Sequence, residues 1–417
     1  MIRKILPVST LGLIAVLVGR SAPLVSWVPD GLPPMPPVGA GLGAYLKPDQ
    51  GQAVLDAALA RFPDRESWDA YAQHVRQRIQ EGAGLAPWPK RTPLNATILA
   101  RRTFDGYSVE NVAFESIPGY FVTGSLYRPL LAKTPFAAIL SPHGHTGRVV
   151  KPEDYEKQGR FEPEMQRRCA SLARMGAVVF SIDMFACDDS IQLLGQDAHR
   201  QPLAFTMQTW NATRAIDFLL TLDGVDPQRL GVSGYSGGGT QTFVLAALDP
   251  RIAVSVPVAM PSSYFFGGCP CESGMPIHRS ADHFVSNIMI AALAAPRPML
   301  VVSDGKDWTQ HTPETEFPFL KKIYAYYGAE HNVANVHLLA EGHDYGPNKR
   351  EAAYRFFAAH LGLNLAAILD AAGKIDEAHV TIEKPAALHV FTAEFPIPPN
   401  ALHDSATIEK SLRNLQQ

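Results

Sequence analysis

Residues 229–248 read RLGVSGYSGGGTQTFVLAAL. The apolar residues at the start of this segment predict a strand, and the longer apolar run at its end predicts a helix. Between them, GYSGG (residues 234–238) matches the pattern G-x-S-x-G. In that pattern a sharp strand-to-helix turn exposes the serine at the top of a sheet, and the glycines remove Cβ atoms that would clash. Ser236 is therefore a candidate nucleophile. One alternative is a glycine-rich turn that serves only to pack a helix. The other is a phosphate-binding loop, but the Lys-Ser/Thr pair of that motif is missing here.

The sequence on both sides of this motif alternates between strand and helix patterns. Residues 96–126 predict two or three antiparallel strands bounded by turns. The predicted strands that follow are 136–140, 177–182, 230–233, 252–258, 299–303 and 333–339, and the predicted helices are 165–175, 206–222, 238–248, 317–327 and 349–361. This order predicts an α/β fold with a mainly parallel sheet covered by helices on both faces. The functional site is then expected outside the carboxyl ends of the strands.

A serine hydroxyl needs a base to take its proton, and the sequence places a histidine where that base is expected. His343 follows the predicted strand at 333–339 and precedes the last predicted helix of the repeat. That position, after the serine in chain order, is typical of the catalytic histidine on this kind of sheet. His311 and His337 are weaker alternatives, because His343 is the histidine with the expected order and place in the sequence. We therefore predict His343 as the general base.

A carboxylate is needed to orient that histidine and to stabilise its charged form. In chain order it should lie between the serine and the histidine, after a strand. The loop at 304–307 reads DGKD and offers two aspartates. We favour Asp307 over Asp304, although either could serve only to shape a turn.

An acyl-transfer site also needs backbone N–H groups that bind the developing oxyanion. One is predicted at Gly237, directly after the serine, and the other in the loop SPHGHTG at 141–147. We assign the second donor to His145, with Gly144 as the alternative. A purely structural His-Gly turn is the other interpretation of this loop.

Three further residues are candidate substrate contacts: His143, Tyr235 and Glu272. Glu272 belongs to an insertion at 259–295 that interrupts the repeat and has the character of a lid. The aromatic residues of the same insertion, 264–266, are equally compatible with substrate contact and with a lid core.

The remaining sequence divides into segments around a catalytic domain at 96–362. Residues 1–22 have a charged start, a short apolar run and small residues, the order of a signal peptide, which predicts a secreted or periplasmic protein. Residues 23–95 contain a proline-rich segment and two short helices divided at Pro63. The extension at 363–417 predicts a helix near 363–371 and a strand near 378–382. An uncleaved N-terminal anchor is the main alternative for the first segment.

Composition excludes several classes of protein. The 417 residues are 46 % hydrophobic and 18 % charged, which is incompatible with a disordered chain. The net charge is −3 and no basic stripe is present, so nothing supports nucleic-acid binding. Beyond the apolar N-terminal run, no stable membrane span is predicted. The sequence says nothing about oligomeric state.

Four cysteines, at 169, 187, 269 and 271, are too few for a disulfide scaffold. Cys269 and Cys271, followed by His278 and His283, suggest zinc, but their spacing differs from common zinc sites. We therefore predict no metal site and favour a disulfide that involves Cys269 or Cys271.

Taken together, residues 97–362 resemble the α/β-hydrolase superfamily. The resemblance rests on His143-Gly144, the loop after Asp183, the 234–238 motif, Asp307 and His343 in that order. Within the superfamily the chain is similar to acetyl xylan esterases, cephalosporin C deacetylases and dienelactone-hydrolase-like proteins. That similarity implies that the residue after His-Gly and the residue after the nucleophile donate to the oxyanion, here His145 and Gly237.

The resemblance also shows departures. The deacetylases usually carry glutamine at the position of Gly237 and tyrosine at the position of His145. Glucuronoyl esterases usually carry arginine after the nucleophile, so Gly237 disfavours that group.

The function implied is a serine esterase that hydrolyses short-chain esters, such as acetyl groups of plant polysaccharide, without a cofactor. Its substrate would be a small-molecule or polysaccharide ester. Serine peptidases on the same fold commonly carry a large propeller domain before the catalytic domain. Only about 95 residues precede the catalytic domain here, which disfavours a peptidase. A non-catalytic hydrolase-fold binding protein is disfavoured because every type of triad residue is present.

Overall fold

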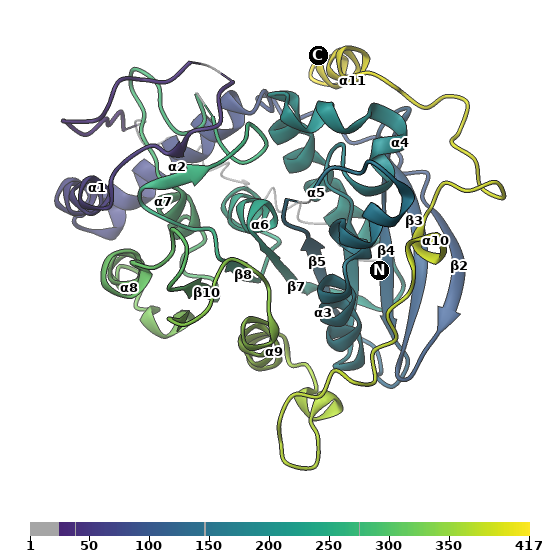
Figure 1. The fold of residues 1–417 in the computed structure, drawn as a ribbon. Helices are drawn as coiled ribbons and strands as arrows, with labels where there is room; N and C mark the ends of the chain where they lie inside the picture. The colour runs from purple at the N-terminus through teal and green to yellow at the C-terminus, as the bar shows by residue number, and fades with distance from the viewer. Residues whose placement is uncertain (1–24, 38, 146, 275) are drawn as a thin grey trace, which may run out of the picture.

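The computed structural model describes residues 25–417 except 38, 146 and 275. The predicted signal peptide at 1–22 lies outside these residues. Within the described part, a nine-stranded sheet has the order β11-β10-β8-β7-β5-β6-β4-β3-β2 (Figure 1). Its strands are β2 (Thr97–Thr103), β3 (Tyr107–Ile117), β4 (Tyr120–Pro129), β5 (Phe136–Pro142), β6 (Ala177–Ile182), β7 (Val225–Tyr235), β8 (Val254–Val258), β10 (Met299–Asp304) and β11 (Val333–Leu338).

The sheet is parallel from β6 through β5, β7, β8 and β10 to β11. Strands β2, β3 and β4 pair antiparallel with one another, and β4 joins them to the rest of the sheet by pairing antiparallel with β6. The predicted mixed, mainly parallel sheet is therefore confirmed. Because the parallel strands run in the same direction, the loops that follow β5, β7, β10 and β11 emerge at the same edge of the sheet.

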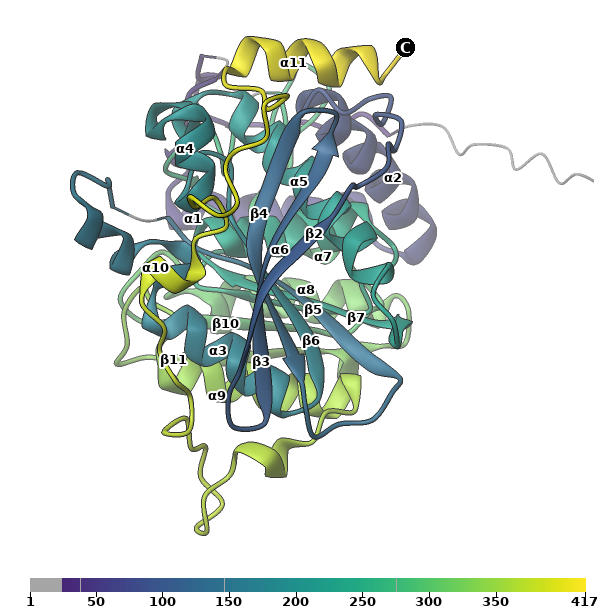
Figure 2. The ribbon, with the colours of Figure 1, turned by 90° about the vertical axis from the view of Figure 1, so that its right-hand side faces the viewer.

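Helices cover both faces of this sheet (Figures 1 and 2). The apolar residues of α3 (Pro163–Arg174) and α9 (Pro347–Leu361) share one buried cluster with one face of the sheet. A second, larger cluster joins the other face to α5 (Leu203–Leu220), α6 (Gly237–Leu248), α7 (Asn287–Ala292) and α8 (Phe317–Ala325). Helix α6 has no exposed face, because neighbours bury almost all of its side chains.

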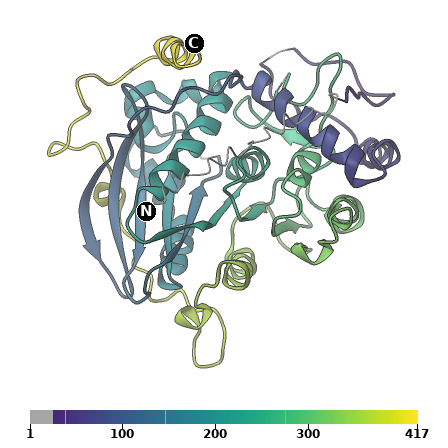
Figure 3. The same ribbon diagram turned by 180° about the vertical axis from the view of Figure 1, so that it is seen from behind.

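The N-terminal segment packs against the insertion at 259–295. Helices α1 (Pro48–Arg61) and α2 (Arg65–Gly82) break at Pro63 as predicted, and the Tyr71 hydroxyl of α2 donates to the Phe284 carbonyl at 2.6 Å. Strand β1 (Gly43–Ala44) pairs antiparallel with β9 (Phe265–Gly267) of the insertion. Seen from behind, α1 and α2 lie at the opposite end of the molecule from β2, β3 and β4 (Figure 3).

The C-terminal extension differs from the prediction. Residues 363–371 contain only a 3-10 turn (Leu365–Ile368), and residues 378–382 form no strand. Instead the tail runs past the β2–β4 end of the molecule, with short helices α10 (Pro385–Leu388) and α11 (Ser405–Asn414) (Figure 2). Its backbone bonds to side chains of the domain: Thr381 N–H donates to the Tyr107 hydroxyl at 3.1 Å. The tail thus packs back on the domain without joining the sheet.

A short helix, α4 (Ile191–Leu194), and a 3-10 turn at Gln196–Arg200 precede α5. Among the described residues, none of the helices combines the length and the hydropathy that a membrane crossing requires.

Candidate active site

Ser236 occupies the turn between β7 and α6, and its backbone is in an unusual conformation. Its φ is 55° and its ψ is −125°, a region that L-residues rarely adopt. The turn is packed tightly against β5, because a Cβ on Gly234 would lie 2.4 Å from the Pro142 carbonyl oxygen and one on Gly238 would lie 2.5 Å from it. Only glycine fits at these two positions. The strained conformation of Ser236 is of the kind that clusters at functional sites.

The loop after β10 brings Asp307 to His343. Oδ2 of Asp307 accepts from Nδ1 of His343 at 2.8 Å, and the Asp307 side chain is almost fully buried. Its other oxygen, Oδ1, accepts from the backbone N–H and the hydroxyl of Thr309, both at 2.6 Å. The carboxylate is therefore held from both sides, and Nε2 is the nitrogen of His343 that can exchange a proton with a substrate or a nucleophile.

Asp304 has a different partner. Its Oδ2 lies 3.4 Å from Nζ of Lys349, and burial raises its pKa to about 6, with the charge of Asp307 adding to the shift. Of the other histidines considered, His337 bonds the Ser303 hydroxyl at 2.9 Å and His311 lies beside Tyr264. The structure thus brings Asp307, rather than Asp304, together with His343.

Aromatic rings connect this pair to the serine turn. The ring centroid of Tyr235, the residue before Ser236, lies 6.1 Å from that of His343. Trp308 lies closer to the histidine, at 4.5 Å, and stacks on Phe265 of the insertion at 3.8 Å. Phe266, by contrast, is fully buried, so the aromatic residues of the insertion serve both as core and as neighbours of the site.

The loop after β5 reaches the other side of the serine turn. A Cβ on Gly237 would lie 3.1 Å from Cε1 of His145 and 3.4 Å from Oε1 of Glu272, so both side chains border the residue after the serine. A Cβ on Gly144 would meet the Tyr235 ring at 2.7 Å. The N-terminus of α6 also begins here, where its unpaired N–H groups favour negative charge. The surroundings of Gly237 and His145 therefore suit an oxyanion.

His143 lies beneath this loop and has almost no exposed surface. Its Nδ1 donates to the Gly144 carbonyl at 2.7 Å, and its Nε2 lies 3.0 Å from Oδ2 of Asp188. Burial alone would lower the pKa of His143, but the Asp188 carboxylate outweighs it and raises the pKa above its usual value. The structure does not bring the His143 side chain to the surface of the site. It holds the loop in place instead.

An arginine that the sequence analysis did not single out organises this region. Arg160 is fully buried and donates to Asp183 and to Asp189, each at 2.5 Å. Asp183 also accepts from the Thr123 hydroxyl at 2.6 Å. The loop after β6 is therefore anchored by a buried ion network.

Replacing Arg160 by glutamine is expected to destabilise the fold by about 3 kcal/mol, because the buried carboxylates of Asp183 and Asp189 lose their cation. Thermal and urea unfolding of the variant measure this loss. The matched control is Arg148→Gln, since Arg148 pairs with Asp197 on the exposed surface and should change stability by less than about 0.5 kcal/mol. Equal stability of the two variants would contradict the prediction.

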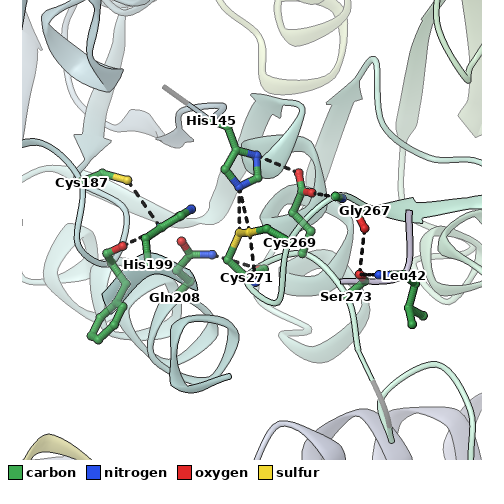
Figure 4. Close-up of a disulfide and its surroundings, with 12 residues drawn as sticks. Leu42, His145, Cys187, His199, Gln208, Gly267, Cys269, Cys271 and Ser273 are labelled. Atoms are coloured by element: carbon green, nitrogen blue, oxygen red, sulfur yellow. Dashed lines mark hydrogen bonds and ion pairs between the residues drawn. A yellow bond between two sulfur atoms is a disulfide. The ribbon is translucent and has the colours of Figure 1, made fainter. Parts of the chain in front are cut away.

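A cavity of about 260 Å³ opens beside Gly237. It is lined by His145, Cys187, His199, Arg200, Gly268, Cys269 and Glu272. Nδ1 of His199 donates to the Phe185 carbonyl at 2.7 Å, and burial lowers the pKa of this histidine to about 4 (Figure 4). No sequence pattern pointed to His199, which reaches the site only through the fold. Glu272, by contrast, was predicted near substrate and does line this cavity.

Cys269 and Cys271 form a disulfide with each other across Pro270. His278 and His283, which follow them in sequence, lie elsewhere: both are buried and bond to backbone carbonyls, of Val285 and Ile277 respectively. The zinc ligand set considered from the sequence is therefore not assembled.

Comparisons with known proteins agree with this geometry. A family model described as glucuronyl esterase of fungi matches residues 192–271. Methylesterase BT1017 superposes with a TM-score of 0.79 at 38 % identity, over 89 % of this chain and 82 % of that chain. The putative hydrolase YtaP of Bacillus subtilis is 26 % identical over 41 % of this chain and 59 % of that protein. The 4-O-methyl-glucuronoyl methylesterase of Neurospora crassa is 24 % identical over 40 % and 51 %. The chain thus spans little more than half the length of these two curated relatives.

Identity of 38 % across most of both chains makes this protein an α/β-hydrolase of the serine esterase class. More narrowly, the chain belongs to the family of carbohydrate esterases that includes Methylesterase BT1017, with glucuronoyl esterases among its relatives. The resemblance to α/β-hydrolase esterases is thereby confirmed. The glucuronyl esterase model matches across Gly237, so this residue by itself does not exclude a likeness to that group.

Proposed function

We propose that the protein is a serine esterase in which Ser236, His343 and Asp307 form the catalytic triad. The observation that carries this proposal is the 2.8 Å bond between Asp307 and His343. The His343 ring lies 6.1 Å from that of Tyr235, the residue before the serine held at φ 55° between β7 and α6. Strand, turn and helix around Ser236 have the arrangement on which α/β-hydrolases place their nucleophile.

In the proposed reaction, Ser236 Oγ attacks the ester carbonyl while Nε2 of His343 takes its proton. The N–H groups of Gly237 and His145 hold the oxyanion of the tetrahedral intermediate. His343 then gives its proton to the leaving alcohol, which departs from the acyl-serine. Water, activated by the same histidine, releases the acid and restores Ser236. The reaction as proposed uses no cofactor.

We further propose that the acyl group is a sugar uronic acid and that the leaving alcohol is small, such as methanol. This differs from the acetyl ester that the sequence favoured. The names of the relatives support the change, since they are called methylesterase and 4-O-methyl-glucuronoyl methylesterase. The cavity beside Gly237 also supports it: at about 260 Å³ it is near the lower end of ligand pockets, which start at about 300 Å³, and Arg200 and two histidines border it. Such a cavity suits one acidic sugar.

The test compares two substrates for the purified protein. A methyl-esterified uronic acid oligosaccharide is expected to release methanol, whereas acetylated xylan is expected to release acetate at least about 100-fold more slowly in kcat/KM, because the acyl group differs. Gas chromatography measures methanol, and an enzymatic assay measures acetate. Faster release of acetate would restore the acetyl ester hypothesis and would contradict the uronic acid proposal.

We also propose that the protein is exported, on the basis of the signal-peptide pattern at 1–22. N-terminal sequencing of protein from its native compartment should find a chain that begins after this segment. A chain that keeps it would favour an N-terminal anchor.

A further inference from the structure

Four side chains that can bind metal lie close together beside the loop after β5: His145, His199, Cys269 and Cys271. One nitrogen or sulfur from each lies within 4.8 Å of the corresponding atom of every other (Figure 4). The four residues come from three separate segments of the chain: the loop after β5, the 3-10 turn before α5 and the 259–295 insertion. The catalytic steps proposed above use the backbone N–H of His145 but none of these four side chains. His145, His199 and Cys269 also line the cavity proposed for the substrate.

His145 is oriented so that one ring nitrogen faces the sulfurs. Its Nδ1 lies 3.1 Å from Oε1 of Glu272, whose other oxygen accepts from Gly268 N–H at 2.7 Å. Its Nε2 lies 3.2 Å from the sulfur of Cys269 and 2.8 Å from that of Cys271. A histidine bound to metal through one nitrogen commonly donates from the other to a carboxylate, and Glu272 provides that carboxylate.

His199 is oriented in the same way. A carbonyl oxygen only accepts, so the bond to the Phe185 carbonyl places the proton of the neutral ring on Nδ1. Nε2 then carries the lone pair, and it is buried without a hydrogen-bond partner among the described residues. A buried polar atom of this kind calls for an explanation, and an unfilled place in a ligand set provides one.

We propose that Cys269, Cys271, His145 and His199 form a tetrahedral zinc site when the two cysteines are reduced. The disulfide seen in the structure is then the oxidised, metal-free form of the same site. Zn–S bonds of about 2.3 Å and Zn–N bonds of about 2.0 Å place tetrahedral ligand atoms about 3.3–3.8 Å apart. The four atoms already lie within 4.8 Å, so small side-chain movements complete the site once the sulfurs separate.

A dithiol reductant supplies the two electrons that convert the disulfide form into the form with two thiols. One thiolate of the reductant attacks the disulfide and forms a mixed disulfide with one cysteine. The second thiol of the reductant then attacks this mixed disulfide and frees the cysteine. The reductant loses two electrons and two protons and becomes a disulfide, and Cys269 and Cys271 become thiols. Zinc then binds both sulfurs as thiolates and releases two protons.

The two forms differ in what they connect. The disulfide joins residues only two apart in sequence, whereas zinc would join three segments around the cavity and fix the ring of His145 against Gly237. Zinc is therefore expected to raise the melting temperature of the reduced protein, and to do so whatever ester the enzyme hydrolyses.

The test titrates cobalt(II), as a spectroscopic substitute for zinc, into the full protein reduced anaerobically with a phosphine. One equivalent per chain is expected to bind, with thiolate-to-cobalt charge transfer in the near ultraviolet and tetrahedral d–d bands in the visible. Zinc should displace the cobalt. The oxidised protein should give neither signal. Absence of the thiolate band in the reduced protein, or equal binding by the oxidised protein, would overturn the proposal.

Variants identify the ligands. Cys271→Ser should abolish the charge-transfer band, and His199→Ala should weaken metal binding more than about 100-fold, since loss of an outer partner alone costs about 10–100-fold. Cys169→Ser is the matched control: this buried cysteine belongs to α3 and is outside the ligand set, so binding should not change. If Cys271→Ser does not fold, His199→Ala and Cys269→Ser decide the question. Unchanged binding in a folded ligand variant would overturn the proposal.

Discussion

Replacing Ser236 by alanine is expected to lower kcat for ester hydrolysis by at least about 10⁴-fold, because no other group can form the acyl-enzyme. The fold should survive. Alanine has no larger side chain than serine, and the strained φ of 55° is the same for both residues. Initial rates with p-nitrophenyl acetate and with the methyl-esterified oligosaccharide measure the loss, and circular dichroism shows whether the variant is folded.

Two further variants complete this experiment. His343→Ala should cause a similar loss, and the double variant should lose no more than either single one, since triad residues act as a unit. Ser26→Ala is the control, because it removes an exposed hydroxyl whose partner among the described residues is the Asp282 carbonyl. Full activity in the Ser236 variant would eliminate the proposed mechanism for both substrates, whereas failure of the uronic acid substrate alone would leave it intact.

The sequence predicted those parts of the fold whose signals are local. Apolar periodicity identified the strands and helices of the domain, and the glycines around Ser236 identified the turn, because a tight strand-to-helix connection leaves no room for a Cβ. The loops with the predicted aspartate and histidine were expected at the same edge of the sheet as the serine, because the strands run parallel. Such signals need no knowledge of distant contacts.

Long-range contacts explain what the sequence could not predict. Residues 380–382 are rich in β-branched side chains, but no strand forms there. The Thr381 N–H donates to the Tyr107 hydroxyl instead, and the Glu383 N–H donates to the side-chain oxygen of Gln166 on α3. His199 is one of 14 histidines and has no motif around it. It meets Cys269 and Cys271 only because the 3-10 turn before α5 folds beside the insertion.

The choice between Asp307 and Asp304 was also open at the level of sequence, because both follow the same strand within four residues. Their environments separate them. Asp307 faces His343 and Thr309, whereas Asp304 faces Lys349, and burial together with the charge of Asp307 raises the pKa of Asp304 to about 6. Only the packing of α9, which supplies Lys349, makes this distinction.

Asp307→Asn is expected to lower kcat by about 10³–10⁴-fold with little change in stability. Thr309 donates two bonds to Oδ1 of Asp307, so the amide oxygen of asparagine will keep that place and its NH₂ group will face His343. Nδ1 of His343 must then accept, which moves the proton of the neutral ring to Nε2. A ring in that tautomer cannot take the proton of Ser236, and the rate falls for this reason.

Asp304→Asn is the matched control, three residues away on the same loop. Its carboxylate contacts Lys349, which also bonds Asp344, so the change should lower the melting temperature but reduce kcat less than about tenfold. A larger loss of kcat in Asp304→Asn than in Asp307→Asn would contradict the prediction. The carboxylate that orients His343 would then be Asp304, which the structure places beside Lys349 rather than beside the histidine.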